Sequence, residues 1–239
     1  MLTAMRGEET EAETDEGDEG PGRVARISGS HWPLTVLGPG RRLGIWFQGC
    51  PLACAGCMSR HTWDAAGGQQ WPVAELLALW REALAAGAEG LTVSGGEPLA
   101  QPEALARLLA GAARTRGAAE ADLLLYTGYT EAEVAADEAR ARAVRHADAL
   151  VTGRYVAARA TDLVWRGSAN QRLVPRTPLG TARYAPHLER RATGRTLQTA
   201  GRGAALALYG VPRPGELAAL ETDLRNAGVE LTDPSWRAG

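Results

Sequence analysis

The chain has 239 residues, 45% of them hydrophobic, which is enough to bury a sizeable core without disulfide or metal support. Its net charge of −2 hides an acidic start: residues 1–20 carry eight acidic residues and one basic residue, and the remaining 20 acidic and 25 basic residues are too evenly balanced to predict nucleic-acid binding. No apolar run is long enough to span a bilayer, which predicts a cytoplasmic protein without a membrane partner, and the absence of lysine excludes Schiff-base, pyridoxal-phosphate and Walker-type phosphate chemistry.

The composition divides the chain into three segments. Residues 7–20 contain almost no apolar side chains and repeat like charges, so they cannot bury enough surface to offset the entropy of ordering. We therefore expect a disordered acidic arm over residues 1–22, a folded core over residues 23–175, and a linker with a small C-terminal extension over residues 176–239.

The first predicted elements of the core lead into a loop that carries the cysteines. Residues 23–37 alternate in polarity enough to predict a short strand or a hairpin. Residues 43–47 are apolar and bounded by glycines, which predicts a buried strand that runs directly into the cysteine loop.

Helix and strand patterns alternate after this loop. Pro72 and Pro102 each predict the start of a helix, and Thr130 with Glu133 forms a capping box for a third helix that reaches about His146. Alternating elements of this kind predict a parallel sheet with right-handed crossovers, whose chemistry lies at the carboxyl ends of the strands. The predicted strands span residues 91–93, 122–126, 149–151 and 172–174.

The C-terminal extension has a simpler pattern. Residues 176–202 are rich in Arg, Thr, Pro and Gly and predict an irregular linker. Beyond them we expect a strand over 204–209, a helix over 214–227 and a strand over 229–231, which together form a small α/β appendage at a sheet edge.

The three cysteines follow the buried strand with the spacing Cys50-x3-Cys54-x2-Cys57. A [4Fe–4S] cluster has four irons, so three thiolates leave one iron open to an exogenous ligand such as S-adenosylmethionine. Zinc is the alternative, because His61 follows Cys57 closely enough to complete a closed Cys3His site. A set of buried structural thiols is a third interpretation.

A second motif favours the cluster. Gly95, Gly96 and Glu97 lie in a Ser-Gly-Gly-Glu-Pro segment that ends a predicted strand, one helix and one strand after the cysteines. Glycines at a strand end let the backbone approach a ligand closely, and the Glu97 carboxylate can accept hydrogen bonds from a ligand ammonium group.

Together these motifs resemble the radical S-adenosylmethionine superfamily. More narrowly, they are similar to its glycyl-radical-enzyme activases, including the activators of anaerobic ribonucleotide reductase. Two positions depart from the pattern: Leu37 stands where activases often carry Asp or Asn, and Gly56 where many superfamily members carry an aromatic residue. The resemblance covers about residues 23–175, and the matching segments are residues 38–42, 49–57, 61–63, 126–129 and 165–171.

The resemblance implies a partial (β/α) barrel of the radical SAM type, with a [4Fe–4S] cluster held by Cys50, Cys54 and Cys57 at its open top. It implies that an electron from a flavodoxin-like or ferredoxin-like donor cleaves S-adenosylmethionine to a 5′-deoxyadenosyl radical. The radical would take hydrogen from a backbone glycine of a large glycyl radical enzyme, such as anaerobic ribonucleotide reductase. The residues that would hold S-adenosylmethionine are Gly95, Gly96, Glu97, Thr127, Gly128 and Asn170.

Two other functions stay open at this point. The long C-terminal extension is compatible with a radical SAM enzyme that modifies a peptide or a small molecule instead. The Cys3His interpretation corresponds to a zinc-stabilised binding module with no catalytic function.

Overall fold

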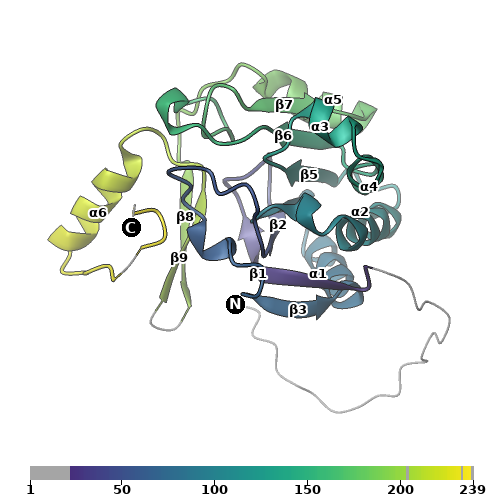
Figure 1. Ribbon diagram of the computed structural model, residues 1–239, viewed down its shortest axis with the longest axis horizontal. Coiled ribbons are helices and arrows are strands. Elements are labelled where there is room, and N and C mark those ends of the chain that lie inside the picture. Colours follow the sequence, from purple (N-terminus) through teal and green to yellow (C-terminus); the bar gives the residue numbers. More distant parts are fainter. Residues whose placement is uncertain (1–21, 203–204, 233, 238–239) are drawn as a thin grey trace, which may run out of the picture.

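The computed structural model describes residues 22–202, 205–232 and 234–237, so the predicted acidic arm lies almost wholly outside the described residues. The described residues form a seven-stranded sheet in the order β3-β1-β2-β4-β5-β6-β7 and a separate β8–β9 hairpin (Figure 1). The strands are β1 (Val24–Leu34), β2 (Arg42–Phe47), β3 (Gln69–Pro72), β4 (Gly90–Gly95), β5 (Asp122–Tyr126), β6 (Ala149–Thr152), β7 (Arg172–Pro175), β8 (Leu197–Arg202) and β9 (Ala205–Gly210).

The helices between β3 and β6 cover one face of the sheet, while the helix after β7 and the β8–β9 hairpin pack on the other face (Figure 1). None of the helices in the described ranges combines the length and the hydropathy that a membrane crossing needs. The helices are α1 (Val73–Ala85), α2 (Pro102–Arg116), α3 (Glu131–Ala135), α4 (Glu138–Ala143), α5 (Pro178–Tyr184) and α6 (Glu216–Asn226), with 3₁₀ turns η1 (Arg60–Thr62), η2 (Pro98–Ala100), η3 (Ala157–Arg159) and η4 (Ala185–His187).

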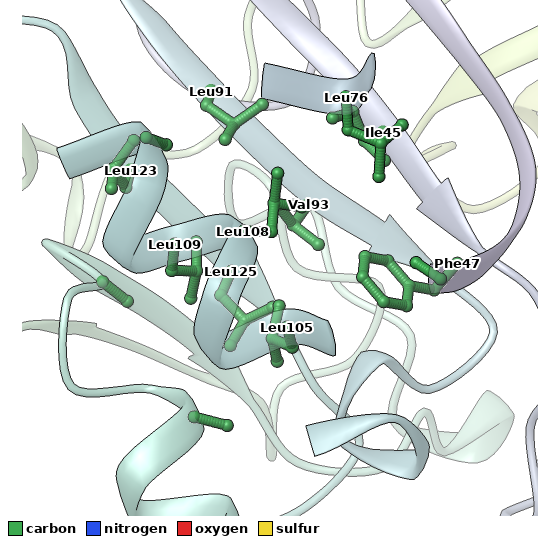
Figure 2. Close-up of a cluster of buried hydrophobic side chains, with 14 of the residues drawn as sticks. Ile45, Phe47, Leu76, Leu91, Val93, Leu105, Leu108, Leu109, Leu123 and Leu125 are labelled. Carbon is green, nitrogen blue, oxygen red and sulfur yellow. The ribbon is translucent and has the colours of Figure 1, made fainter. Parts of the chain in front are cut away.

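The main core lies between the central strands and the helices α1 and α2. Alternation along β2 directs Leu43, Ile45 and Phe47 to the helix side, where Figure 2 shows Ile45 and Phe47 together with leucines of β4, β5 and α2. Leu105 and Leu108 lie on the inward face of α2 and are fully buried. Each such side chain stabilises the fold by about 1.5–3 kcal/mol, so this layer fixes the sheet and hence the loops at its ends.

The opposite face of the sheet buries a charged group at the amino ends of the strands. Arg42 and Asp122 are both fully buried, and their Nη2 and Oδ2 atoms lie 2.7 Å apart. Arg42 Nε also donates to Thr92 Oγ1 at 2.6 Å. The first residues of β2 and β5 are therefore joined directly, and Thr92 of β4 is bonded to the same arginine, which pins these three strands at one end.

The predicted α/β core is confirmed, and the sheet is open, as a partial barrel requires. Strands β2, β4, β5 and β6 are parallel, but β1, β3 and β7 pair antiparallel at the edges. The predicted parallel sheet is therefore confirmed for the four central strands, but the edge strands pair antiparallel. Parallel neighbours need a long crossover, usually an α-helix, whereas only a short segment joins β1 to β2 and only the 3₁₀ turn η3 lies between β6 and β7.

The third predicted helix is interrupted. Its capping box between Thr130 and Glu133 is present, yet the helix ends near Ala136. Asp137 has an extended backbone, and its side chain accepts a hydrogen bond from Arg140 N at 3.0 Å, which starts α4 as a new helix.

The C-terminal extension differs from its prediction in two places. Residues 176–202 contain α5 and β8 as well as irregular chain, and residues 229–231 form no strand. The predicted strand and helix are present as β9 and α6. Because β8 and β9 pair antiparallel, the appendage is a hairpin followed by a helix. Tyr209 of the hairpin packs on Trp46 and His31, so the appendage covers a sheet face and not an edge.

Candidate active site

The cysteine loop begins at the carboxyl end of β2 and is closed at its base by backbone and side-chain hydrogen bonds. Gly49 N donates to the carbonyl of Thr62 at 2.8 Å. Gln48 is only 3% exposed, and its Nε2 donates to the carbonyls of His61 and Asp64 at 3.2 and 2.8 Å. The sheet therefore holds both ends of the loop in place.

The three thiols are free and half-buried, and each accepts at least one backbone hydrogen bond. Burial raises the pKa of the Cys50 and Cys54 thiols, while the amide donors oppose this shift because they stabilise the thiolate. A sulfur-only donor set with amide hydrogen bonds fits an iron–sulfur cluster. The donors are the amides of Leu52 and Ala53 for Cys50, of Tyr155 for Cys54 and of Ser59 for Cys57.

Gly95 and Gly96 bring the end of β4 against the base of the cysteine loop. Gly95 has a φ of 113°, and a Cβ there would lie 2.3 Å from the carbonyl oxygen of Phe47. A Cβ at Gly96 would lie 2.3 Å from the carbonyl oxygen of Gly49. The two glycines are therefore required for close packing of two loops, in addition to any approach to a ligand.

Glu97 is 1% exposed and turns into the protein, where its carboxylate joins two loops. Oε1 accepts from Leu99 N and Thr127 Oγ1, both at 2.9 Å, and Oε2 accepts from Gly128 N at 2.7 Å. Burial raises the pKa of Glu97, and these hydrogen bonds oppose the shift. Glu97 thus fixes the position of the Thr127–Gly128 turn relative to the Gly95–Gly96 turn.

Gly128 completes the contact among the predicted site segments. A Cβ at Gly128 would lie 2.3 Å from the Leu52 side chain of the cysteine loop. The structure therefore brings together the cysteine loop, the Gly95–Glu97 turn and the Thr127–Gly128 turn, as the positions of these motifs at strand ends predict.

Asn170 lies on the segment before β7, beside the loop that follows β6. Its Nδ2 donates to the Arg154 carbonyl at 2.8 Å, and its Oδ1 is buried without a partner among the described residues. The neighbouring Gln171 donates from Nε2 to the Gly153 carbonyl at 2.9 Å. These amides brace the loop after β6, which in turn reaches Cys54.

Tyr155 in that loop is a site residue that the sequence interpretation missed. Its amide donates to the Cys54 sulfur. Its ring lies beside Gly56, where an added Cβ would be 3.5 Å from Tyr155 Cε1. An aromatic side chain from a different loop therefore lies beside the position at which many superfamily members carry their own aromatic residue. Nothing in the local sequence around Tyr155 signals this placement.

His61, the fourth ligand of the zinc alternative, is exposed, although desolvation by its neighbours lowers its pKa. Within the described ranges, no group of three or more His, Cys, Asp or Glu side chains is arranged to hold a metal ion. His61 instead lines a groove of about 630 Å³ together with residues of the β8–β9 hairpin and the C-terminal tail.

The C-terminal tail contacts the cysteine loop directly. Ser235 Oγ donates to the Met58 carbonyl at 2.8 Å, and Arg60 Nη1 donates to the Arg237 carbonyl at 2.8 Å. The extension is thus part of the surroundings of the site.

Comparison with known proteins shows the same core elsewhere. Residues 36–174 match a family described as a 4Fe-4S single cluster domain. The anaerobic ribonucleoside-triphosphate reductase-activating protein of Pasteurella multocida is 34% identical over 147 residues, which cover 59% of this chain and 92% of that protein. The pyruvate formate-lyase 1-activating enzyme of Escherichia coli is 42% identical over 83 residues, which cover 34% of this chain and 34% of that protein. The crystal structure of QueE from Escherichia coli aligns with a TM-score of 0.34 and 20% identity, over 45% of this chain and 54% of that chain.

The matched segment contains all three cysteines and the Gly95–Glu97 turn, which defines the class: an iron–sulfur enzyme built on an α/β core. The chain belongs to the 4Fe–4S single-cluster domain family and, within it, to the radical S-adenosylmethionine activating enzymes. It is accordingly an oxidoreductase whose cofactors are a [4Fe–4S] cluster and S-adenosylmethionine.

Proposed function

We propose that this protein cleaves S-adenosylmethionine reductively and installs a glycyl radical on a partner enzyme, and that the partner is an anaerobic ribonucleotide reductase. The observation that carries the proposal is the set of three cysteine sulfurs in one loop, each with an amide donor, in a chain that has no fourth cysteine. When bound, the cluster and S-adenosylmethionine would supply, with one electron from a reductant, a 5′-deoxyadenosyl radical able to take hydrogen from the partner's glycine. The activating proteins that match this chain over most of their own length support this choice of partner.

The residues of the core would bind and orient the cofactors. Cys50, Cys54 and Cys57 would hold the cluster. The turns at Gly95–Glu97 and Thr127–Gly128 would hold the methionine and ribose portions of S-adenosylmethionine. Asn170 would contact it from the segment before β7, since its Oδ1 has no partner among the described residues. We assign these functions to a core of residues 23–175.

The buried Glu97 would act mainly through charge and position. Its hydrogen-bond donors are neutral, so a cationic ammonium group nearby would be attracted to its carboxylate at low local dielectric. The same carboxylate keeps the two cofactor-binding turns in register. We further propose a flavodoxin-like or ferredoxin-like protein as the electron donor.

The test is anaerobic reconstitution with iron and sulfide, followed by incubation with S-adenosylmethionine, a reductant and purified anaerobic ribonucleotide reductase. We expect a cluster EPR signal that changes when S-adenosylmethionine is added, 5′-deoxyadenosine as a product, and a glycyl-radical doublet on the reductase. A cluster that is indifferent to S-adenosylmethionine would contradict the chemistry. Colourless protein with stoichiometric zinc would favour the Cys3His binding module instead.

A second candidate is the modification of a peptide or a small molecule by the same radical. It is favoured by the groove of about 630 Å³ that the C-terminal extension builds beside the cysteine loop. Formation of 5′-deoxyadenosine with the reductase present, but without a glycyl doublet, would support this candidate over the first.

A further inference from the structure

A second cavity lies apart from the cysteine loop, near the amino end of β2. Its volume is about 370 Å³, within the range that accommodates a small organic ligand. Its wall comes from residues 35–40 before β2, residues 161–166 and residues 187–196 after α5, together with Val211 and Arg213. Among the described residues that line it, none belongs to the cysteine loop or to the Gly95–Glu97 turn.

The wall of this cavity is rich in positive charge. Asp162 is the one carboxylate among its described lining residues, and it is already ion-paired with Arg191. Arg213 contacts Glu216 at 3.4 Å and is partly neutralised. The lining arginines are Arg166, Arg190, Arg195 and Arg213.

Two of these arginines are available to a ligand at the surface of the cavity. Arg190 and Arg195 are exposed, and their side chains have no hydrogen-bond or ion-pair partner among the described residues. Their charge can therefore be recruited without breaking an existing contact.

Deeper in the wall, two buried nitrogen atoms lack partners. Arg166 is only 5% exposed, and while its Nη2 donates to the carbonyl of Leu188, its Nε has no partner among the described residues. The Nδ1 atom of His187 is buried and equally without a partner. Burial lowers the pKa of Arg166, and the nearby Glu189 carboxylate, itself exposed, opposes this effect.

Unpaired polar atoms of this kind are rare in folded proteins, and a buried guanidinium without a hydrogen-bonded anion is costly. Two of them in the wall of one cationic cavity indicate that the wall is built around a polar ligand. A carboxylate ligand would bring one charge to several guanidinium groups. A phosphate group brings more charge and matches the fork of donors on each arginine.

We propose that this cavity binds a phosphorylated small molecule, with its phosphate oxygens held by Arg166 and by the exposed Arg190 and Arg195. The site is separate from the proposed cofactor site, so its ligand is neither the radical source nor the group that the radical attacks. The inference therefore goes beyond the activase function and holds or fails independently of it.

The experiment is isothermal titration calorimetry on the full chain with inorganic phosphate, pyrophosphate and a nucleoside triphosphate, each without metal. We expect saturable binding to one site that weakens as salt is added. Arg190→Gln combined with Arg195→Gln should weaken binding roughly tenfold or more, because charge-assisted hydrogen bonds are lost from residues that stabilise nothing else. Arg81→Gln, the same change at an exposed position of α1, should leave binding unchanged.

The three probes also separate the possible ligands. Equal affinity for phosphate and the nucleotide would mean that the cavity recognises the phosphate group alone. Tighter nucleotide binding would mean that the organic part of the ligand fills the remaining volume. Arg166→Lys keeps the charge but loses the fork, and should weaken binding in a protein whose unfolding curve is checked in parallel. If none of the probes binds, or if the double variant and Arg81→Gln behave alike, the cavity holds only water and the proposal is overturned. Should Arg166→Lys fail to fold, the double variant decides alone.

Discussion

The two ends of the parallel sheet each bury a carboxylate, and the partners of the two carboxylates differ in charge. At the amino ends, Asp122 is fully buried. Its Oδ2 lies 2.7 Å from Arg42 Nη2, and its Oδ1 lies 2.8 Å from Arg183 Nε. The hydroxyl of Tyr184 also donates to it. This carboxylate is surrounded by groups that balance its charge.

At the carboxyl ends, Glu97 is equally buried, but among the described residues its hydrogen-bond donors are two backbone amides and the hydroxyl of Thr127. The cation whose field reaches it is Arg140, which lies over the ring of Tyr129 at 3.9 Å from the centroid. The negative charge of Glu97 is therefore incompletely balanced. Because these partners do not offset the loss of solvent, burial raises the pKa of Glu97.

The difference indicates how stability and function are divided along the strands. A carboxylate between two guanidinium groups holds β2, β5 and α5 together and has no charge left for a ligand. A carboxylate with neutral donors keeps its charge available for a cationic ligand group. The amino end of the sheet is thus expected to determine folding, and the carboxyl end to determine activity.

The largest effect is expected from Cys54→Ser at the carboxyl end. Loss of a cluster ligand should reduce 5′-deoxyadenosine formation by more than about 1,000-fold, since the chemistry depends on the cluster. The unfolding free energy of the cluster-free protein should change by less than about 1 kcal/mol, because the thiol is only half-buried. Iron and sulfide content and product formation measure the loss of activity, and urea denaturation measures the unfolding free energy. Met58→Leu in the same loop is the control, and normal turnover by the Cys54 variant would refute the ligand assignment.

Asp122→Asn at the amino end should have the opposite effect, with a large loss of stability and little change in activity. It leaves the buried guanidinium of Arg42 without its anion and removes the nearer of two anions from the partly exposed Arg183, which should lower the unfolding free energy by about 3–5 kcal/mol. Activity per folded molecule should stay within about twofold, because the site lies at the other end of the strands. Glu89→Gln is the matched control: Glu89 is exposed and lies 3.9 Å from Arg183, so its loss should change the unfolding free energy by less than about 1 kcal/mol. Equal destabilisation by both changes would contradict the assigned role of the buried pair.

Glu97→Gln tests whether the charge at the carboxyl end is functional. In the variant, the amide nitrogen takes the place of one carboxylate oxygen and so faces a backbone N–H, either that of Leu99 or that of Gly128. Two donors then meet, which should cost about 1–3 kcal/mol of stability. Affinity for S-adenosylmethionine should also fall by about tenfold, because the negative charge is lost. Equilibrium binding and urea denaturation on the same preparations separate the two effects. Unchanged affinity would mean that Glu97 serves the fold alone.

The pH dependence of stability tests how burial and hydrogen bonding are balanced at the Glu97 carboxylate. Because the pKa of Glu97 is raised in the folded protein, its protonated form favours folding: the contribution is full below the ordinary glutamate value of about 4.3 and is lost as pH rises through the raised value. Glutamine does not titrate. The stability advantage of the wild type over Glu97→Gln should therefore be largest at acidic pH and shrink toward neutral pH. A difference that grows with pH would show that donors outweigh burial at this carboxylate.

Much of the site could be predicted because its signals are local. The three cysteines, the Gly95–Glu97 turn and Thr127–Gly128 each follow a short apolar strand, and parallel strands bring such ends together. The start of α2 at Pro102 and the capping box before α3 were also predicted from a few neighbouring residues.

The features that were missed depend on contacts distant in sequence. Tyr155 reaches Cys54 from a loop after β6, and no spacing rule connects the two. Strand β8 is partly polar, and it is held by pairing with β9 and by Gln198, which accepts from Thr35 N at 3.0 Å and donates to the Pro33 carbonyl at 2.8 Å. The inward direction of Glu97 was missed for the same reason, because its donors at Thr127 and Gly128 belong to another strand end.

The smallest expected effect compares two single hydroxyl groups, one at each end of the sheet. Tyr184→Phe and Thr127→Val each remove one donor to a buried carboxylate and nearly preserve shape. Tyr184→Phe should cost about 1 kcal/mol of stability and leave S-adenosylmethionine binding unchanged, because Asp122 keeps both guanidinium partners. Thr127→Val should cost a similar amount, but it leaves Glu97 with backbone donors alone and also removes the acceptor for Tyr129 N at 3.1 Å. The ionised form of Glu97 then becomes less favourable, so binding of the cationic cofactor should weaken severalfold in this variant only. Calorimetric titration of both variants decides the matter, and parallel losses of cofactor affinity would mean that the two ends are not separated in function.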